Sequence, residues 1–563
     1  MSLGSSGSKR KGGEVVAETL EELGIEKAFV QPGSQVLPIL GHLDGRRMEV
    51  IGVVNETNGT VMADVVGRIT GKPALVLVTA GPGVTNCVTG VAQAYTANSP
   101  LLLISASNPL NSPAEAFHGV ADPLFQEEIF RPITKYSRTV SEPGHLREAI
   151  VEALVHSTSG RYGPSYVAVV DRLLEEELEV SPTTPLPIGV SIGVKGTPMG
   201  EIVGEINASN SPLIFAGKYV ARGRVGDQVE RLARSLLAPV IVPRSYPDSF
   251  PNESELYAGS IGQFDHPAAS YALSTADLVI NVGVRVGSSE DEALRRRCGE
   301  RCRSIYVDVD NPSDLKVKGV FGDLRRILEA ISEGVGMVGE AHREFRERRI
   351  RTIGEVRHRV ERAVEEELGS ASSGPNPLRV IRTIERALGQ DHFVIGDAGA
   401  AGGVWLNDLF RFKRVGSFLH SRNYDGMGFA VPGSIGAKVA SPESDVVAVT
   451  GDGSFLLGVS DLGLAKKLGV NPVIVVFNDS KFGLIWREQV EMGYRPLATE
   501  LPSVSVAAMT EAMGLRGVKV SSDEEFRDEL DKSLSSKEGT VIEVPIKSEF
   551  PYPSRTVWRR KYF

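Results

Sequence analysis

The sequence predicts an α/β protein with three successive domains, each a mainly parallel sheet flanked by helices. Three observations indicate this fold. The chain has 563 residues, which is more than one hydrophobic core usually supports. Short apolar runs rich in valine and isoleucine alternate with helical patterns, as is typical of buried parallel strands. These runs also fall into three series, which two stretches of different composition separate.

The first series lies within residues 1–180 and consists of KAFV, EVIGVV, ALVLVTA, PLLLISA and YVAVV. A proline-rich linker, SPTTPLPIG, follows it. The second series, PLIFAG, APVIVP, ADLVINVG and SIYVDVD, predicts a middle domain at 190–335. Residues 336–375 are densely charged with helical spacing, and they predict a helical linker. The third series, from HFVIGDAG to GTVIEVPI, predicts a last domain at 376–563.

The composition excludes several classes of function. The 62 basic and 71 acidic residues give a net charge of −9, so we expect no nucleic-acid partner. No run of about 18 apolar residues occurs, so we expect no membrane span. Three cysteines are too few for a disulfide framework and suit a reducing compartment. We therefore expect a soluble, cytoplasmic protein.

The sharpest chemical signal is a pair of polar motifs that follow two apolar strands of the third series. Because both motifs stand at the carboxyl ends of parallel strands, they lie where ligands bind in open α/β sheets. Side-chain oxygens of Asp452 and Asn478, with the carbonyl of Ser480, form a set that Mg²⁺ prefers. Glycines beside the aspartate let the backbone approach a diphosphate. The alternative interpretation is that both motifs are ordinary turns after strands and bind no ligand. The first motif consists of Gly451, Asp452, Gly453 and Ser454.

This spacing resembles the GDG-to-Asn motif of enzymes that depend on thiamine diphosphate (ThDP). Residues 56–95 and 424–440 resemble the first and third domains of acetolactate synthases. The resemblance implies a pyrimidine-binding domain, a Rossmann-like middle domain and a diphosphate-binding domain, with the ThDP-binding fold in the first and third. It implies ThDP and Mg²⁺ as cofactors. It also implies a homodimer or homotetramer with its active site at the subunit interface, because that family divides the site between subunits.

Glu56 follows the apolar run EVIGVV and precedes a helical pattern. The resemblance implies that it is the catalytic carboxylate that bonds the pyrimidine N1′ of ThDP and so activates the cofactor. The alternative is a glutamate favoured at a helix start by the helix dipole. The strand–glycine–helix segment VTAGPGVTN contains Pro82 and Asn86, which the resemblance places near the pyrimidine.

Three further residues are implied to bind the cofactor. Met427 matches the bulky residue that holds ThDP in its bent form, although a methionine is more often part of a core. The carbonyl of Asp425 matches the group that bonds the 4′ amino nitrogen. Gly399 lies within DAGAAGG, where alanines replace the family's Gln-His pair and leave backbone contacts to the diphosphate.

Gln126, within PLFQEEIF, matches a glutamine that faces the substrate in acetolactate synthases, so it is a second candidate catalytic residue. The alternative is a polar loop residue. His118 lies eight residues earlier in a loop flanked by glycine and proline. It is either a proton shuttle or a surface histidine.

The leading hypothesis is an enzyme that decarboxylates a pyruvate-like 2-oxo acid and joins the remainder to a second carbonyl, as acetolactate synthases do. An alternative is a benzoylformate decarboxylase-like enzyme that releases an aldehyde, since Ser34 stands in a similar QPGS segment. The third hypothesis is a paralogue that binds ThDP but does not catalyse a reaction. Ser289 replaces an arginine that FAD-dependent acetolactate synthases carry four residues after Arg285, which argues against FAD as a further cofactor.

Overall fold

The computed structural model describes residues 9–179, 193–298, 303–311, 315–369, 374–421, 423–547 and 550–560. These residues form two compact units. The first unit holds those within 1–190, 421–443 and 457–470, and the second holds those within 191–420, 444–456 and 471–563.

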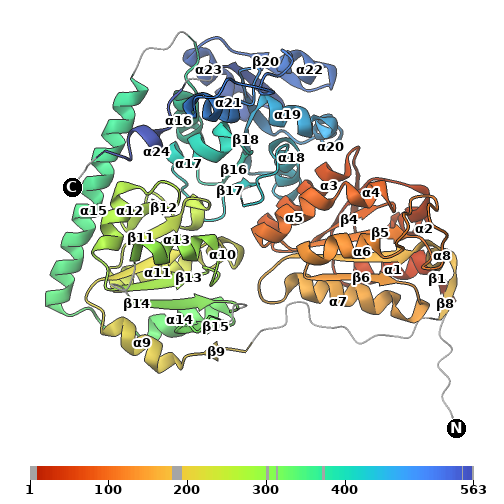
Figure 1. The fold of residues 1–563 in the computed structure, drawn as a ribbon, viewed down its shortest axis with the longest axis horizontal. Coiled ribbons are helices and arrows are strands. Elements are labelled where there is room, and N and C mark those ends of the chain that lie inside the picture. The colour runs from red at the N-terminus through yellow and green to blue at the C-terminus, as the bar shows by residue number, and fades with distance from the viewer. Residues whose placement is uncertain are drawn as a thin grey trace. The chain divides into compact units, whose positions relative to one another are not determined.

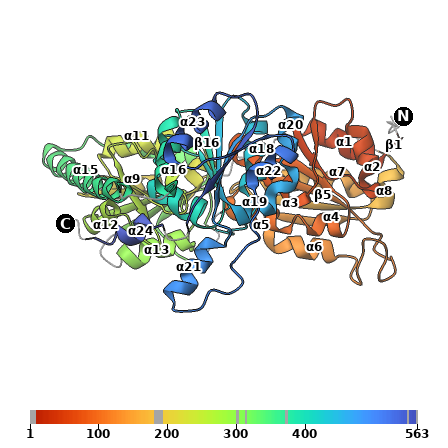
Figure 2. The same cartoon turned by 90° about the horizontal axis from the view of Figure 1, so that it is seen from above.

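The first unit is built on a six-stranded parallel sheet with the strand order β3-β2-β4-β5-β7-β6. Helices flank it (Figure 1 and Figure 2). A short antiparallel pair, β1 with β8, lies beside it. The strands are β1 (Lys9–Lys11), β2 (Lys27–Val30), β3 (Glu49–Gly52), β4 (Ala74–Val78), β5 (Leu101–Ser107), β6 (Tyr136–Val140), β7 (Pro164–Val170) and β8 (Glu177–Glu179).

The second unit contains two sheets. Six strands of the middle sheet run parallel in the order β12-β11-β10-β13-β14-β15, which is the order of a doubly wound Rossmann fold, and β9 adds an antiparallel edge. The strands are β9 (Lys195–Gly196), β10 (Pro212–Ala216), β11 (Val240–Pro243), β12 (Tyr257–Ile261), β13 (Leu278–Val282), β14 (Arg303–Asp308) and β15 (Gly319–Phe321).

The last sheet is parallel throughout, with the order β17-β16-β18-β19-β21-β20. When strands are numbered along the chain, this order is the same as in the first sheet. The predicted α/β fold is therefore confirmed. Along the chain, a Rossmann-like sheet follows the first sheet and precedes a last sheet of the same topology as the first. The strands are β16 (His392–Gly396), β17 (Phe418–His420), β18 (Asp445–Gly451), β19 (Val473–Asn478), β20 (Arg516–Lys519) and β21 (Thr540–Pro545).

Helices cover the faces of these sheets because the strands are apolar on both sides; every residue of β4, β5, β7, β10 and β13 is buried. Within the described residues, no helix is long and apolar enough to cross a membrane. Helices of the first unit include α1 (Gly12–Glu22), α2 (Leu37–Leu43), α3 (Glu56–Thr70), α4 (Pro82–Thr85), α5 (Val88–Ala97), α6 (Phe125–Phe130), α7 (Leu146–Thr158), α8 (Asp171–Glu175), α18 (Ala430–Ala440) and α20 (Leu464–Leu468).

Helix α19 (Asp452–Gly458) spans the boundary between the units. Helices of the second unit include α9 (Met199–Asn207), α10 (Tyr219–Arg222), α11 (Gly226–Leu236), α12 (Pro267–Ser274), α13 (Ser289–Cys298), α14 (Leu324–Gly334), α15 (Glu340–Leu368), α16 (Pro377–Ala387), α17 (Leu406–Leu409), α21 (Gly483–Glu491), α22 (Val506–Ala512), α23 (Asp523–Leu534) and α24 (Pro553–Thr556).

Helix α15, the 29-residue charged helix, is held by its arginines. Arg346 donates to the carbonyl oxygens of residues 209, 210 and 236, and Arg349 donates to those of residues 212 and 272. Arg357 donates to the carbonyls of residues 252, 254 and 257. The dense charge that the sequence shows here therefore binds backbone carbonyl groups of the strands, helices and connections of the middle sheet.

Helices α3 and α18 pack closely in the first unit. A Cβ atom added to Gly436 would lie 2.8 Å from Cα of Met62, so only glycine permits this approach of the two backbones. The side chain of Asn55 caps α3 by accepting the N–H of Thr57 at 2.8 Å. Packing and cap together fix the start of α3.

Candidate active site

The start of α3 presents a buried carboxylate. Glu56, the first residue of the helix, is only 8% exposed. Its Oε2 accepts a hydrogen bond from Nδ2 of Asn86 at 3.0 Å. A Cβ atom added to Gly83 would lie 3.6 Å from Oε1, so the loop after β4 passes directly beside the carboxylate. The structure thus brings together Glu56 and Asn86. Pro82, the first residue of α4, is exposed.

The turn that carries Glu56 is fixed by Asp461, which is 2% exposed. Its carboxylate accepts the N–H groups of Val54 at 2.6 Å and Asn55 at 3.2 Å. It also accepts Nδ2 of the buried Asn58 at 2.8 Å. No sequence pattern indicated this contact, because Asp461 lies far along the chain from the turn.

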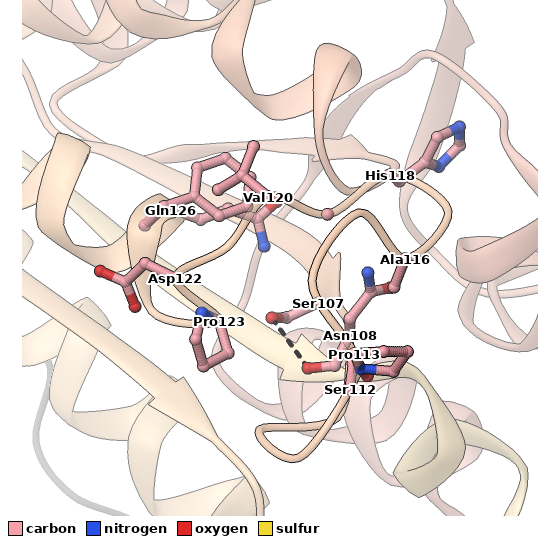
Figure 3. Close-up of a pocket in the computed structure, with 12 residues that line it drawn as sticks. Ser107, Asn108, Ser112, Pro113, Ala116, His118, Val120, Asp122, Pro123 and Gln126 are labelled. Atoms are coloured by element: carbon pink, nitrogen blue, oxygen red, sulfur yellow. Dashed lines mark hydrogen bonds between the residues drawn. The ribbon is translucent and has the colours of Figure 1, made fainter.

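The loop after β4 is also hydrogen-bonded to Gln126. The amide oxygen of Gln126 accepts the N–H of Gly81 at 2.9 Å, and its amide nitrogen donates to the carbonyl of Ala106 at 3.2 Å. Gln126 is buried and therefore positions this loop. Its predicted contact with substrate stays a prediction. It lines a pocket, seen in Figure 3, with residues that include Ser107, Asn108, Pro113, Asp122 and Phe125.

Asp425 and Met427 precede α18 in the first unit. Asp425 has a φ of 62°, and its N–H donates to the carbonyl of Ser421 at 2.7 Å. Met427 is 37% exposed, so it is not a core residue. Its side chain is accessible to a ligand, and the cofactor contacts implied for both residues stay predictions.

A cluster of oxygen atoms lies at the carboxyl end of the last sheet, in the second unit. Asp452 follows β18 and is 3% exposed, and Asn478 ends the neighbouring strand β19. The N–H of Ser480 donates to Oδ1 of Asn478 at 3.2 Å and also to the Asp452 carboxylate. The side chains of Asp452 and Asn478 are therefore brought together, whereas the Ser480 carbonyl accepts the N–H of Leu501 at 2.8 Å, and its contact with a metal stays a prediction. Burial, and then the nearby charge of Asp479, raise the pKa of Asp452 to about 6.

Glu543 orients the Asn478 side chain, a role that the sequence analysis missed. This glutamate of β21 is 1% exposed and accepts Nδ2 of Asn478 at 3.0 Å. Because a carboxylate only accepts, the amide nitrogen must face Glu543 and the amide oxygen must face Ser480. The signal was present as an acidic residue in the apolar run VIEVP.

Backbone around this cluster is open to a ligand. Gly399 follows β16 with a φ of 99°, and no atom lies within 4 Å of a Cβ added there. Beside Gly451 the nearest atom to an added Cβ is 4.0 Å away, whereas Gly453 packs against Phe482. Ser454 is buried. Among the described residues there is no group of three or more His, Cys, Asp or Glu side chains that would hold a metal ion. The cluster's carboxylate and amide oxygens instead fit Mg²⁺, which completes its shell with phosphate and water.

Comparison with known proteins agrees with this arrangement. Residues 10–128 match the family description "Thiamine pyrophosphate enzyme, N-terminal TPP binding domain". Residues 199–331 match the central domain of the same enzymes, and residues 397–544 match their C-terminal TPP binding domain. The matches cover both the segment that carries Glu56 and the segment that carries Asp452 and Asn478.

Individual relatives extend over nearly the whole chain. Acetolactate synthase of Bacillus subtilis is 25% identical over 543 residues, which cover 96% of this chain and 93% of the relative. The acetolactate synthase large subunit of Lactococcus lactis is 27% identical, covering 96% and 94%. Sulfoacetaldehyde acetyltransferase of Castellaniella defragrans is also 27% identical, with the same coverage. The chain therefore belongs to the thiamine pyrophosphate enzymes and is similar to acetolactate synthases over almost its entire length.

Proposed function

We propose that this enzyme uses ThDP and Mg²⁺ to decarboxylate a 2-oxo acid such as pyruvate and to join the remaining fragment to a second carbonyl compound. The observation that carries the proposal is the buried Glu56 carboxylate, held by Asn86 against the loop after β4. Simple binding of a cofactor does not require a carboxylate at that place, whereas activation of a pyrimidine ring does. This argues against a non-catalytic paralogue.

The protein's residues divide the work. Asp452, Asn478 and the Ser480 carbonyl would hold Mg²⁺ with the diphosphate, and Glu56 would hold a proton at the pyrimidine nitrogen. When bound, ThDP supplies the nucleophilic carbon and accepts the electron pair that remains when CO₂ leaves. We propose a homodimer or homotetramer in which Glu56 of one subunit and the oxygen cluster of another serve the same cofactor.

FAD, a dinucleotide, is not part of the proposal, because Ser289 stands where FAD-dependent acetolactate synthases carry an arginine. In a doubly wound sheet such a ligand lies at the switch point, here between β10 and β13. The N–H of Tyr219 donates to the Gly283 carbonyl at 3.2 Å there. A Cβ added to Gly217 would lie 2.5 Å from that same oxygen. The two connections thus pack closely against each other at this point. The purified enzyme should show no flavin absorbance.

Product analysis with pyruvate tests the proposal. Purified protein with ThDP and Mg²⁺ should consume pyruvate and form acetolactate. Free acetaldehyde as the only product would establish the decarboxylase instead, the outcome that Ser289 at the family's arginine position favours. If a panel of 2-oxo acids is left unconsumed, the proposed function is wrong.

A matched pair of variants links the activity to the site. Glu56→Gln keeps an oxygen that accepts from Asn86 but cannot share a proton, so turnover should fall by about 100-fold or more. Glu49→Gln removes a half-exposed carboxylate at the start of the preceding strand, and it should leave turnover unchanged.

A further inference from the structure

Three residues of the second unit, 499–501, pair with the loop that follows β19. The carbonyl of Thr499 accepts the N–H of Phe482 at 2.8 Å. The N–H of Leu501 donates to the carbonyl of Ser480, also at 2.8 Å, and the two residues between these bonds form an antiparallel bridge. The segment therefore forms a short antiparallel pair with the loop next to the oxygen cluster.

The chain beyond this pair also contacts the oxygen cluster. The carbonyl of Val504 accepts Nδ2 of Asn478 at 3.2 Å. The N–H of Ala507, in the first turn of α22, donates to Oε2 of Glu543 at 3.0 Å. Because Glu543 is the carboxylate that orients Asn478, residues 499–507 are hydrogen-bonded to both partners of this pair as well as to the loop after β19.

The antiparallel pairing decides which side chains face the cluster. Side chains two residues apart on a strand point to the same face, and directly opposed residues on paired strands also share a face. Phe482, Thr499 and Leu501 therefore lie on one face of the pair. A Cβ atom added to Gly453 would lie 2.8 Å from Cε1 of Phe482 and 3.1 Å from Cδ1 of Leu501. The face that carries Thr499 is thus the face toward the loop of Asp452.

Thr499 is a buried polar residue in an otherwise open stretch. It is 3% exposed, and it is the single buried residue within 491–505, a range that the structure describes in full. Its Oγ1 is buried and has no hydrogen-bond partner among the described residues. A buried hydroxyl without a partner costs free energy, and native proteins rarely leave one. This hydroxyl therefore indicates a partner that the described chain does not supply.

The charges around the cluster restrict the chemistry of that partner. Burial and then the charge of Asp479 raise the pKa of Asp452, so two carboxylates already stand close together here. An anionic group is therefore accepted at this place only together with a cation, as a phosphate group is when Mg²⁺ binds it. A phosphate oxygen only accepts hydrogen bonds, and the rotatable hydroxyl of Thr499 can donate one.

We propose that Thr499 is a cofactor-binding residue whose hydroxyl donates a hydrogen bond to a phosphate oxygen of the diphosphate group. This inference rests on the cofactor site of the proposed function. Residues 499–507 then contribute to that site in two ways. Their backbone holds the loop after β19 and the Asn478–Glu543 pair in place, and their one buried hydroxyl contacts the cofactor itself.

Thr499→Val tests this assignment, because valine keeps the size and the branched shape of threonine and lacks only the hydroxyl. In calorimetric titrations with ThDP at saturating Mg²⁺, the Kd should rise by about 10–100-fold, since a hydrogen bond to a charged group is lost. The melting temperature of the cofactor-free enzyme should stay the same or rise, because the variant removes a buried hydroxyl that no protein group satisfies. A purely structural role predicts the opposite pair of results, a less stable cofactor-free enzyme with unchanged affinity.

Two further variants serve as controls. Thr499→Ser keeps the hydroxyl and should bind ThDP about as tightly as wild type. Thr352→Val, in α15 of the same unit, removes a hydroxyl that donates to the Arg348 carbonyl at 3.1 Å, and it should leave the affinity unchanged.

Wild-type affinity for ThDP in Thr499→Val refutes the assignment, and the hydroxyl then binds no more than a water molecule. A higher Mg²⁺ requirement without a change in ThDP affinity at saturating Mg²⁺ refutes it too, because the hydroxyl then contacts a metal-bound water. A wild-type enzyme that binds ThDP but consumes no 2-oxo acid refutes the proposed function instead and leaves the binding result for Thr499 intact.

Discussion

Replacement of Asp461 by alanine should loosen the turn that carries Glu56. The carboxylate accepts three hydrogen bonds from Val54, Asn55 and Asn58, at 2.6, 3.2 and 2.8 Å. A buried donor left without a partner costs about 1–3 kcal/mol, so three donors give roughly 3–9 kcal/mol of local destabilisation. Since about 1.4 kcal/mol is a factor of ten, amide exchange in this turn should accelerate on the order of 100-fold or more.

Hydrogen–deuterium exchange of peptides that cover residues 53–58, measured together with pyruvate turnover, tests this directly. Turnover should fall by about 100-fold, because a displacement of the catalytic group by about 1 Å costs that much. Asp461→Asn keeps one acceptor and should lie between wild type and the alanine variant. Glu443→Ala, at an exposed position of the same unit, is the control. Wild-type exchange and turnover in Asp461→Ala would refute the reasoning.

Three further predictions follow from particular contacts. Burial lowers the pKa of His266 to about 3, whereas an unfolded histidine titrates near 6.5. Stability should therefore be lost as pH falls from about 6.5 toward 3, by up to roughly 5 kcal/mol. His266→Asn can still cap α12, and it should reduce the loss of stability between pH 6.5 and 3 that denaturation curves measure. If the variant loses as much stability as wild type over this pH range, the prediction is wrong. Gly436→Ala should lower the melting temperature, since its Cβ meets Met62 backbone, at a cost of about 1–3 kcal/mol; an unchanged melting temperature would argue against the close packing of α3 on α18. Glu543→Leu should weaken Mg²⁺-dependent ThDP binding by about 10–100-fold in titrations, because Asn478 loses the partner that orients it; wild-type affinity would show that Glu543 plays no part.

Much of the fold could be predicted from sequence because local patterns carry it. Buried parallel strands read as runs of valine and isoleucine, and a strand followed by glycine and aspartate marks the carboxyl end of a sheet. The charged stretch from residue 340 was expected as a helix, and α15 confirms it. The sequence showed the charge of its arginines but not their targets, which are backbone carbonyl groups far away in the chain.

The candidate site was predictable only where its residues stand in one motif. Asp452, Asn478 and Ser480 follow adjacent strands, so their proximity could be inferred from sheet topology. Asp461 acts through hydrogen bonds to residues far away in the chain, and no local pattern distinguishes it from an ordinary polar residue. Glu543 stands out in the sequence as an acidic residue within an apolar strand, but its contact with Asn478 emerges only when the chain is folded.

Titration of ThDP in the presence and absence of Mg²⁺, followed by turnover of pyruvate, tests the central claim most directly. Wild type should bind ThDP tightly only with Mg²⁺. Asp452→Ala should lose this binding, whereas Glu56→Gln should keep most of it and lose turnover. Metal-dependent binding that survives in Asp452→Ala, or full turnover in Glu56→Gln, would contradict the assignment of these two residues to the two ends of the cofactor.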